Sequence, residues 1–313
     1  MTVIAIVGPT ASGKTGVAAA LSKRVDGEII SADSRQVYKY LDIGTNKSGF
    51  WDNEKKMRLF KDVPQHLTDI IEPDETFSAG DFARVAFEKI KYLQQNKKVP
   101  IIAGGTGLYL KALMDGLAPM PEKNEEIRKA LREKLEKKGI EYLYDELKKI
   151  DPESAEKNKD NPHRLIRAIE VFKATGVPIS ELQKKTSPSK EKFIQFGLNY
   201  QREMLYKRIN ERSIRMLNSG MIEETEKVLR MGYSKSSEAF KSIGYNSVLK
   251  YLDKKISKDN LIETLQRDTR HYAKRQMTWF RKDKRINWIN LNENQSSDEN
   301  IADLIFKTTA NLV

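Results

Sequence analysis

One octapeptide near the amino terminus carries the residue types that bind phosphate. It fits the pattern G-x-x-x-x-G-K-S/T and consists of Gly8, Pro9, Thr10, Ala11, Ser12, Gly13, Lys14 and Thr15. In such a loop, backbone N–H groups and the N-terminus of the next helix converge on an anion. The lysine adds a positive charge, and the threonine hydroxyl ligates a phosphate-bound Mg²⁺. The sequence therefore predicts a phosphate site with Mg²⁺ on Thr15.

An aspartate follows the next apolar run. The segment Glu28–Ala32 is a candidate strand, and Asp33 begins the turn after it. Ligands of an open α/β sheet lie beyond the carboxyl ends of the strands, which places Asp33 beside the phosphate loop. A carboxylate there serves as a metal ligand or as a general base. The alternative is that Asp33 caps the N-terminus of a helix, a position that aspartate favours.

The third candidate strand lacks a carboxylate at its end. Residues 99–103 run directly into Gly104, Gly105 and Thr106. Phosphate-loop NTPases place Mg²⁺ with an aspartate at the end of a Walker-B strand. The loop is therefore expected to hold a diphosphate whose fate is not hydrolysis of a γ-phosphate, with Asp33 as the substitute metal ligand. Whether a nucleoside triphosphate also binds there stays open.

Strands and helices alternate along the chain. The predicted strands lie at 3–7, 28–32, 99–103, 193–200 and 287–291. One crossover helix is predicted at 78–95. The predicted fold is α/β, with a P-loop NTPase-like, doubly wound parallel sheet core, an inserted small all-helical domain and a helical C-terminal region. The core takes residues 1–119 and 189–313, and the insertion takes 120–188. Residues 48–75 are expected to be loop-rich, with His66 in a structural role.

Composition points to a polyanionic partner. Lys and Arg number 56 against 44 Asp and Glu, which gives a net charge of +12. Nucleic acid is the leading candidate, and a solubilising basic surface is the alternative. The absence of cysteine excludes disulfides, thiol catalysis and Cys-ligated zinc, and three scattered histidines argue against a His-based metal site. Without a signal peptide or a long apolar run, the expected location is the cytoplasm, with no membrane contact.

Two pairs of arginines share helix faces. Arg208 and Arg212 are four residues apart, and their face suits a leaving diphosphate unless they are simply solvated. Arg164 and Arg167 are three residues apart. That pair binds phosphate or pairs with Glu170 along the helix.

Two short loops each have a functional and a structural interpretation. The glycine-containing loop Leu41–Lys47 presents a lysine that reaches phosphate or is solvated. The loop Lys241–Tyr245 presents an aromatic ring that stacks on a base or packs in the interior. We favour a functional role for the first loop and leave the second open.

The segment 261–285 is the clearest basic surface. At about 100° per residue, one side of the predicted helix carries Arg267, Arg270, His271, Lys274, Arg281 and Arg285. The opposite side carries Leu261, Leu265, Tyr272, Trp279 and Phe280. An apolar face that is buried leaves a cationic ridge for the phosphate backbone of a nucleic acid. A merely solvated ridge is the alternative.

Five segments together resemble one enzyme family. They are GPTASGKT at 8–15, DSRQVYKYLDIGTNK at 33–47, GGTGLYLKAL at 104–113, HRLIRAIEVF at 163–172 and AKRQMTWFRK at 273–282. In this order they closely resemble the bacterial tRNA dimethylallyltransferases, over nearly the whole chain. Asn46 replaces a common alanine, and Lys241 stands where some members carry arginine. Both differences concern only details of RNA contact.

The resemblance implies transfer of a dimethylallyl group from its diphosphate to N6 of the adenosine at tRNA position 37, next to the anticodon. By this analogy Thr10, Lys14, Thr15, Mg²⁺ and Arg212 hold the diphosphate. Asp33 is the general base, and Thr106 lies in the reaction channel. The tRNA-contacting positions implied by the resemblance are Asp33, Ser34, Arg35, Gln36, Thr106, Arg128, His163, Arg164, Leu165, Ile166, Arg167, Lys241, Gly244, Tyr245, Lys274, Arg275, Gln276, Thr278 and Arg281. The helical insertion would clamp the anticodon stem-loop, and we expect a monomer.

Three other functions share part of these features. A small-molecule P-loop kinase would share the architecture of the first third of the chain but would not need the cationic helix. A nucleic-acid-binding ATPase would bind RNA and hydrolyse ATP. An isopentenyltransferase that acts on free AMP or ATP would ignore tRNA.

Overall fold

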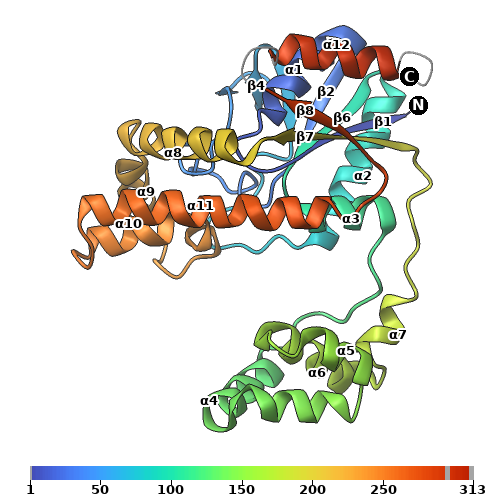
Figure 1. Cartoon of the computed structure of the whole chain (residues 1–313), viewed down its shortest axis with the longest axis vertical. Helices are drawn as coiled ribbons and strands as arrows, with labels where there is room; N and C mark the ends of the chain where they lie inside the picture. The colour runs from blue at the N-terminus through green and yellow to red at the C-terminus, as the bar shows by residue number, and fades with distance from the viewer. Residues whose placement is uncertain (1, 293–296, 310–313) are drawn as a thin grey trace. The chain divides into compact units, whose positions relative to one another are not determined.

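Strand β1 (Val3–Val7) lies inside the sheet of this computed structural model, which describes residues 2–292 and 297–309 (Figure 1). Its side chains alternate between the two faces, as strand geometry requires. Ile4 and Ile6 join an apolar cluster with helix α1 (Lys14–Val25), whereas Val3, Ala5 and Val7 join a cluster with helix α2 (Ala79–Gln95). The sheet is therefore covered by helices on both faces, as the doubly wound prediction requires.

The described residues form one eight-stranded sheet in the order β3-β4-β5-β2-β6-β1-β7-β8. All neighbours from β5 to β8 pair in parallel, whereas β4 is antiparallel to both of its neighbours. The remaining strands are β2 (Gly27–Ala32), β3 (Phe50–Asp52), β4 (Met57–Phe60), β5 (Val63–His66), β6 (Val99–Gly104), β7 (Phe193–Tyr200) and β8 (Ile286–Leu291).

The segment 48–75 differs from its prediction. It contains β3, β4 and β5, which are only three or four residues long. Strands that short show no usable alternation of polar and apolar residues, and pairing with β2 and with one another holds them in place. His66 is structural as expected, because its Nε2 lies 2.6 Å from Oε2 of Glu28.

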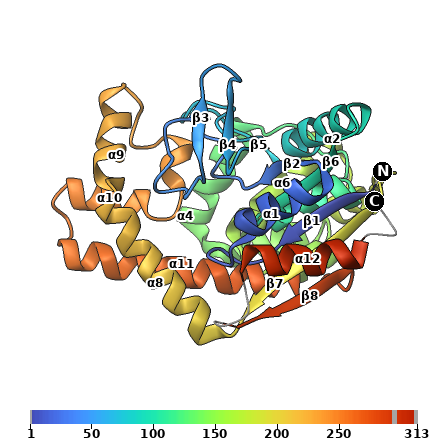
Figure 2. The ribbon, with the colours of Figure 1, turned by 90° about the horizontal axis from the view of Figure 1, so that it is seen from above.

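Helix α1 packs beside α12 (Asp298–Thr309) on one face of the sheet, and Figure 2 shows the two lying next to each other. The other face carries α2 and α3 (Gly107–Asp115). Helix α2 begins where its sequence predicts, because Ser78 and Asp81 form a capping box. This layering brings the carboxyl ends of β1, β2 and β6 to one edge of the sheet.

The helices between β7 and β8 pack around a separate apolar cluster, which also includes Val37 and Leu41. They are α8 (Arg202–Asn218), α9 (Met221–Arg230), the short 3₁₀ helix η1 (Glu238–Lys241), α10 (Tyr245–Leu252) and α11 (Lys258–Phe280). Among residues 2–292 and 297–309, no helix combines the length and apolar character needed to cross a membrane.

The chain divides into two compact units, Met1–Met114 with Lys190–Val313 and, separately, Asp115–Ser189. The second unit contains residues 120–188, for which we predict a helical insertion. It surrounds its own apolar cluster and consists of α4 (Glu125–Lys148, interrupted at Gly139), α5 (Pro152–Asn158), α6 (Pro162–Thr175) and α7 (Ile179–Gln183). Its assignment to the anticodon stem-loop stays a prediction.

Candidate active site

The phosphate loop joins β1 to α1. Gly13 has a φ of 86°, a conformation that a side chain would strain, and a Cβ on Gly8 would meet the carbonyl oxygen of Leu198 at 2.9 Å. Both glycines are therefore required by the backbone path. Nζ of Lys14 donates to the carbonyl oxygen of Pro9 at 2.7 Å, so the ammonium lies within the loop that it is expected to charge.

Two arginines of α8 hold the loop from outside. Nε of Arg208 donates to the carbonyl oxygen of Ala11 at 2.9 Å, and Nη2 of Arg212 donates to Oγ1 of Thr10 at 2.6 Å. The structure thus places both arginines on the loop, as their shared helix face predicts. Burial lowers the pKa of Arg212 to about 10, while the negative charge of Asp33 opposes that change.

Asp33 stands where β2 ends, in a turn rather than at the start of a helix. Its Oδ1 accepts a hydrogen bond from the backbone N–H of Arg35 at 2.8 Å. The next residue, Ser34, donates its N–H to Oγ1 of Thr106 at 3.0 Å, which ties this turn to the loop after β6. A hydrogen bond therefore joins Thr106 to the turn that carries Asp33. The roles predicted for the two residues, proton acceptor and lining of the reaction channel, require that they lie in one place.

The charge of Asp33 reaches the cations of the loop. Burial lowers the pKa of Lys14 to about 8, and Asp33 opposes this shift while Arg212 adds to it. Burial also raises the pKa of Tyr272 to about 12, and Asp33 raises it further. The charge of Asp33 therefore acts on Lys14, Arg212 and Tyr272. Cations and a carboxylate that influence one another in this way suit a reaction that pairs an anionic leaving group with a proton acceptor.

Gln276, one of the predicted RNA contacts, lies inside the protein. The side chain is only 6% exposed, so it is not part of the surface. Its Oε1 accepts from the N–H of Thr10 at 2.7 Å, and its Nε2 donates to the carbonyl oxygen of Gly105 at 2.8 Å. The amide thus joins the phosphate loop to the loop after β6. Its position on the buried stripe of α11, between Ala273 and Phe280, is the sequence signal for such an internal role.

Two further residues among the predicted RNA contacts are buried as well, Gly244 and Tyr245. Tyr245 is fully buried, and its hydroxyl donates to Oε1 of Glu224 at 2.6 Å. Gly244 is buried as well, and a Cβ there would meet Met221 and Leu265. Of the open interpretations of this loop, packing is the correct one. Lys241 is exposed and pairs with Glu238.

The second unit separates its candidate contacts into buried and exposed residues. Leu165 and Ile166 are buried in the apolar cluster of that unit, so neither side chain is available to RNA. Arg128 and Arg167 both donate to the carboxylate of Glu170, at 2.9 and 2.8 Å. For Arg167 the pairing interpretation is therefore correct. His163 and Arg164 are exposed and stay candidates.

The ridge on α11 is smaller than predicted. Arg270 donates to Oδ1 of Asn210 on α8, and Arg285 lies beyond the end of the helix and pairs with Asp283. Trp279 is 40% exposed and does not belong to the buried face, because it lies beside the stripe that ends at Phe280. Of the predicted ridge, Arg267, His271, Lys274 and Arg281 are exposed along this segment. Arg275 and Thr278, which belong to the predicted RNA contacts, are exposed as well.

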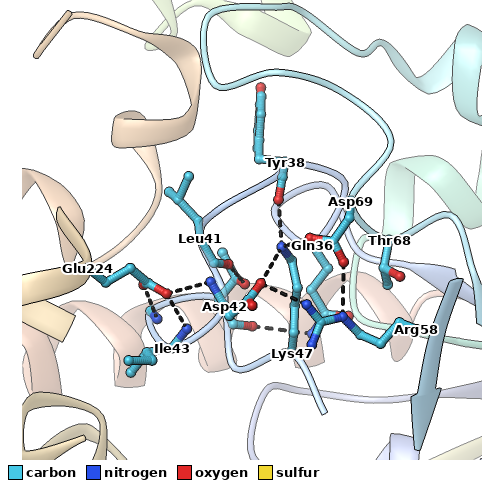
Figure 3. Close-up of polar contacts among 12 residues, drawn as sticks. Gln36, Tyr38, Leu41, Asp42, Ile43, Lys47, Arg58, Thr68, Asp69 and Glu224 are labelled. Carbon is cyan, nitrogen blue, oxygen red and sulfur yellow. Dashed lines mark hydrogen bonds and ion pairs between the residues drawn. The ribbon is translucent and has the colours of Figure 1, made fainter. Parts of the chain in front are cut away.

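Lys47 does not face phosphate. Its side chain is fully buried and donates to the carboxylates of Asp42 and Asp69 and to the carbonyl oxygen of Tyr38, as Figure 3 shows. Arg58 bonds to the same two carboxylates at 2.9 Å each. The loop 41–47 thus takes part in an ion network around the buried cations of Lys47 and Arg58. The spacing of the loop residues does not reveal this network.

The donor set at the carboxyl ends of β1 and β2 suits Mg²⁺, which prefers oxygen ligands. Thr15 supplies a hydroxyl at the start of α1, and Asp33 supplies a carboxylate. Within the described ranges there is no cluster of three or more metal-ligating side chains. An ion here would therefore take its other ligands from phosphate and water, as Mg²⁺ commonly does.

Comparison with known proteins identifies the family. A family model described as IPP transferase matches residues 36–283. The chain belongs to the IPP transferase family. Two relatives of this family member are the tRNA dimethylallyltransferases of Endomicrobium trichonymphae and Acetivibrio thermocellus. The first is 50% identical over 281 residues, which cover 90% of this chain and 92% of the relative. The second is 46% identical, with 96% of each chain covered.

Solved structures agree with the fold of this IPP transferase family member. The full-length tRNA isopentenylpyrophosphate transferase of Bacillus halodurans is 35% identical, with a TM-score of 0.69, and 99% of this chain and 97% of that chain are covered. A eukaryotic dimethylallyltransferase described as acting on tRNA is 25% identical, with a TM-score of 0.82, and covers 99% of this chain and 79% of its own. The α/β fold and the resemblance found in the sequence are confirmed.

Proposed function

We propose that this protein transfers a dimethylallyl group from dimethylallyl diphosphate to N6 of the adenosine at tRNA position 37, next to the anticodon, and releases diphosphate. The observation that carries the proposal is the convergence of Lys14 and Arg212 on the phosphate loop beside Asp33. The end of β6 carries no carboxylate that would serve γ-phosphate hydrolysis. The names of the relatives, tRNA dimethylallyltransferase, support the same reaction.

In the proposed reaction, N6 of the adenosine attacks the first carbon of the dimethylallyl group. The bond between that carbon and the diphosphate oxygen breaks, and its electron pair leaves with the diphosphate. Asp33 accepts the proton that N6 loses, while Lys14 and Arg212 stabilise the charge that grows on the leaving group. A bound Mg²⁺, held by Thr15 and the diphosphate itself, would supply further positive charge at the diphosphate oxygens.

The substrate adenosine has to leave its stack to reach a site at the ends of the strands. Exposed cations on α11, among them Lys274 and Arg281, would bind the RNA backbone near the site. The exposed His163 and Arg164 support a second contact through the helical unit, at the anticodon stem-loop. We expect the protein to act in the cytoplasm as a monomer.

One assay separates this proposal from its rivals. The protein is incubated with labelled dimethylallyl diphosphate and Mg²⁺, with either tRNA or AMP as acceptor, and ATP hydrolysis is followed in parallel. We expect label on tRNA alone and no ATP turnover. Label on AMP would identify an enzyme of free nucleotides, and ATP turnover without label transfer would identify a kinase or an ATPase.

A further inference from the structure

Glu224 of α9 binds a row of backbone donors from the loop 41–47. Its Oε2 accepts from the N–H groups of Asp42 and Ile43 at 2.6 and 2.8 Å, and its Oε1 accepts from the N–H of Gly44 at 3.1 Å (Figure 3). The hydroxyl of Tyr245 donates to Oε1 as well, at 2.6 Å. One carboxylate on a helix outside the sheet therefore fixes three consecutive residues of the loop, through bonds that charge strengthens.

Packing alone does not hold the loop. On one side Gly44 lies against the ring of Tyr245, and a Cβ there would approach the ring to 2.3 Å. On the other side Asp42 and Ile43 border a cavity of about 740 Å³. The loop thus has free space on one side, where it is restrained by the bonds to Glu224 together with the ion pairs of Asp42 with Lys47 and Arg58.

The loop in turn is bonded to the turn that carries Asp33. Nε2 of Gln36 donates to the carbonyl oxygens of Thr45 and Asn46, both at 3.2 Å. Oε1 of the same amide accepts from Oγ of Ser31, at the end of β2, at 3.0 Å. Gln36 therefore joins the loop to the end of β2, two residues before Asp33, and its amide is engaged in bonds within the protein.

We infer that Glu224 is a positioning residue for Asp33, which it reaches through the loop 41–47 and Gln36. The inference rests on the proposed function, in which Asp33 accepts the N6 proton. Proton acceptors have to lie within hydrogen-bond reach of the proton they take. A displaced loop shifts Gln36 and so the turn at Asp33, which lowers the rate of transfer without removing a group that binds either substrate.

The test is Glu224→Gln, compared with Glu226→Gln as the matched control. Glu226 lies on the same helix and pairs with Arg230 at 3.7 Å on the exposed side. In Glu224→Gln an amide NH₂ has to face backbone N–H donors. Because a misplacement of about 1 Å can cost about 100-fold, we expect kcat to fall by about 10- to 100-fold. KM for each substrate should stay within about twofold, and the control should match the wild type.

Tyr245→Phe separates positioning from simple stabilisation. It removes one bond to Glu224 but leaves the three loop bonds, so we expect a lower melting temperature with kcat near the wild-type value. An equal loss of kcat in Tyr245→Phe and Glu224→Gln at equal loss of stability would overturn the inference. So would an unchanged kcat in folded Glu224→Gln.

Amide hydrogen exchange makes the inference independent of the reaction. We expect faster exchange in Glu224→Gln at residues 33–36 as well as at residues 42–44. Acceleration confined to residues 42–44 would overturn the positioning role even if no transfer could be measured. Absence of transfer by the wild type, by contrast, would reject the proposed function. If Glu224→Gln does not fold, Glu224→Asp keeps the charge, shortens the reach, and carries the same expectations.

Discussion

Arg212 and Thr10 lie 202 positions apart in the chain, and Nη2 of Arg212 donates to Oγ1 of Thr10 at 2.6 Å. The bond joins α8 to the phosphate loop. Nε of the same guanidinium is buried and has no hydrogen-bond partner among the described residues. A buried donor without an acceptor costs about 1–3 kcal/mol. An anion bound in the loop would supply the missing acceptor. The guanidinium of Arg212 is therefore arranged to bind an anionic ligand.

Arg212→Ala and Lys14→Ala should therefore weaken binding of dimethylallyl diphosphate without changing the salt dependence of tRNA binding. Both side chains face the loop, so neither contributes a cation to the RNA surface. Calorimetric titration with the diphosphate and tRNA titration over a salt series measure the two effects. Arg215→Ala is the control, because Arg215 is exposed on the same helix and pairs with Glu211. A changed tRNA salt slope in Arg212→Ala would move that residue to the RNA surface.

Asp33→Ala should abolish transfer and leave tRNA binding largely intact. Loss of a general base typically lowers the rate by about 10²- to 10⁴-fold. Asp33→Asn is the sharper variant, because its amide oxygen can still accept from the N–H of Arg35 but cannot take the proton. Single-turnover transfer with both substrates saturating measures the rate. Retention of more than about a tenth of the wild-type rate would show that another group accepts the proton.

Lys14 gives the site a predictable pH dependence. Its pKa is lowered from 10.5 to about 8 by burial. The diphosphate binds the protonated ammonium, so affinity should fall by up to about tenfold per pH unit above pH 8. Titrations of Lys14→Met across the same pH range remove the contribution of ligand ionisation. An identical pH profile in both proteins would contradict the assignment.

The lowered pKa of Lys14 has the opposite effect on the stability of the protein without ligand, which should increase as pH rises. Between about pH 8 and 10.5 the unfolded chain binds a proton that the folded chain lacks, so this group raises the free energy of unfolding as pH rises. Below about pH 8 Lys14 is protonated in both the folded and the unfolded chain, so this group no longer changes the free energy of unfolding with pH. Denaturant melts of wild type and Lys14→Met over this range measure the difference, which should shrink as pH rises.

Replacing Lys274 and Arg281 together with alanine should weaken tRNA binding and flatten its salt dependence. Both side chains are exposed, and in the part of the chain that the structure describes neither forms an ion pair. Each neutralised phosphate contributes up to about 0.9 to the slope of log affinity against log salt. We expect a slope smaller by roughly one to two units, with unchanged affinity for the diphosphate. An unchanged slope would mean that tRNA is held elsewhere.

The apolar side of α11 supplies a stability prediction that differs from the one its sequence suggests. Phe280 is 3% exposed, so Phe280→Ala should lower the free energy of unfolding by about 3–5 kcal/mol. Trp279, at 40% exposed, should cost clearly less when it is replaced by alanine. Denaturant melts of the two variants give the order. A larger loss in Trp279→Ala would contradict the burial seen here.

The central features of the fold could be predicted because their signals are local. The β-branched run of β1, the glycines of the phosphate loop and the Ser78–Asp81 capping box each occupy a few consecutive residues. The position of Asp33 directly after β2 could be predicted as well, because the end of a parallel strand fixes which edge of the sheet the next residue lies on.

The features that could not be predicted depend on partners far away in the chain. Whether Lys47 is buried depends on Asp69 and Arg58, and the buried amide of Gln276 depends on Thr10 and Gly105. The helical periodicity of α11 predicts an interior position for both Trp279 and Phe280, because both fall on the broad apolar side of the helix although they lie about 100° apart around its axis. Which of the two aromatic side chains is buried depends on the elements that pack against the helix.

The pairing of β1 has a consequence for synthesis on the ribosome. β1 pairs with β6 on one side and with β7 on the other, and the whole unit Asp115–Ser189 lies between β6 and β7 in the chain. The nascent chain therefore carries one edge of β1 with unpaired backbone N–H and C=O groups while the helical unit is being made. That unit has its own core and can fold first, as domains commonly do during translation. Among the described strands, β1 is thus the one separated from its last pairing partner by the longest stretch of chain.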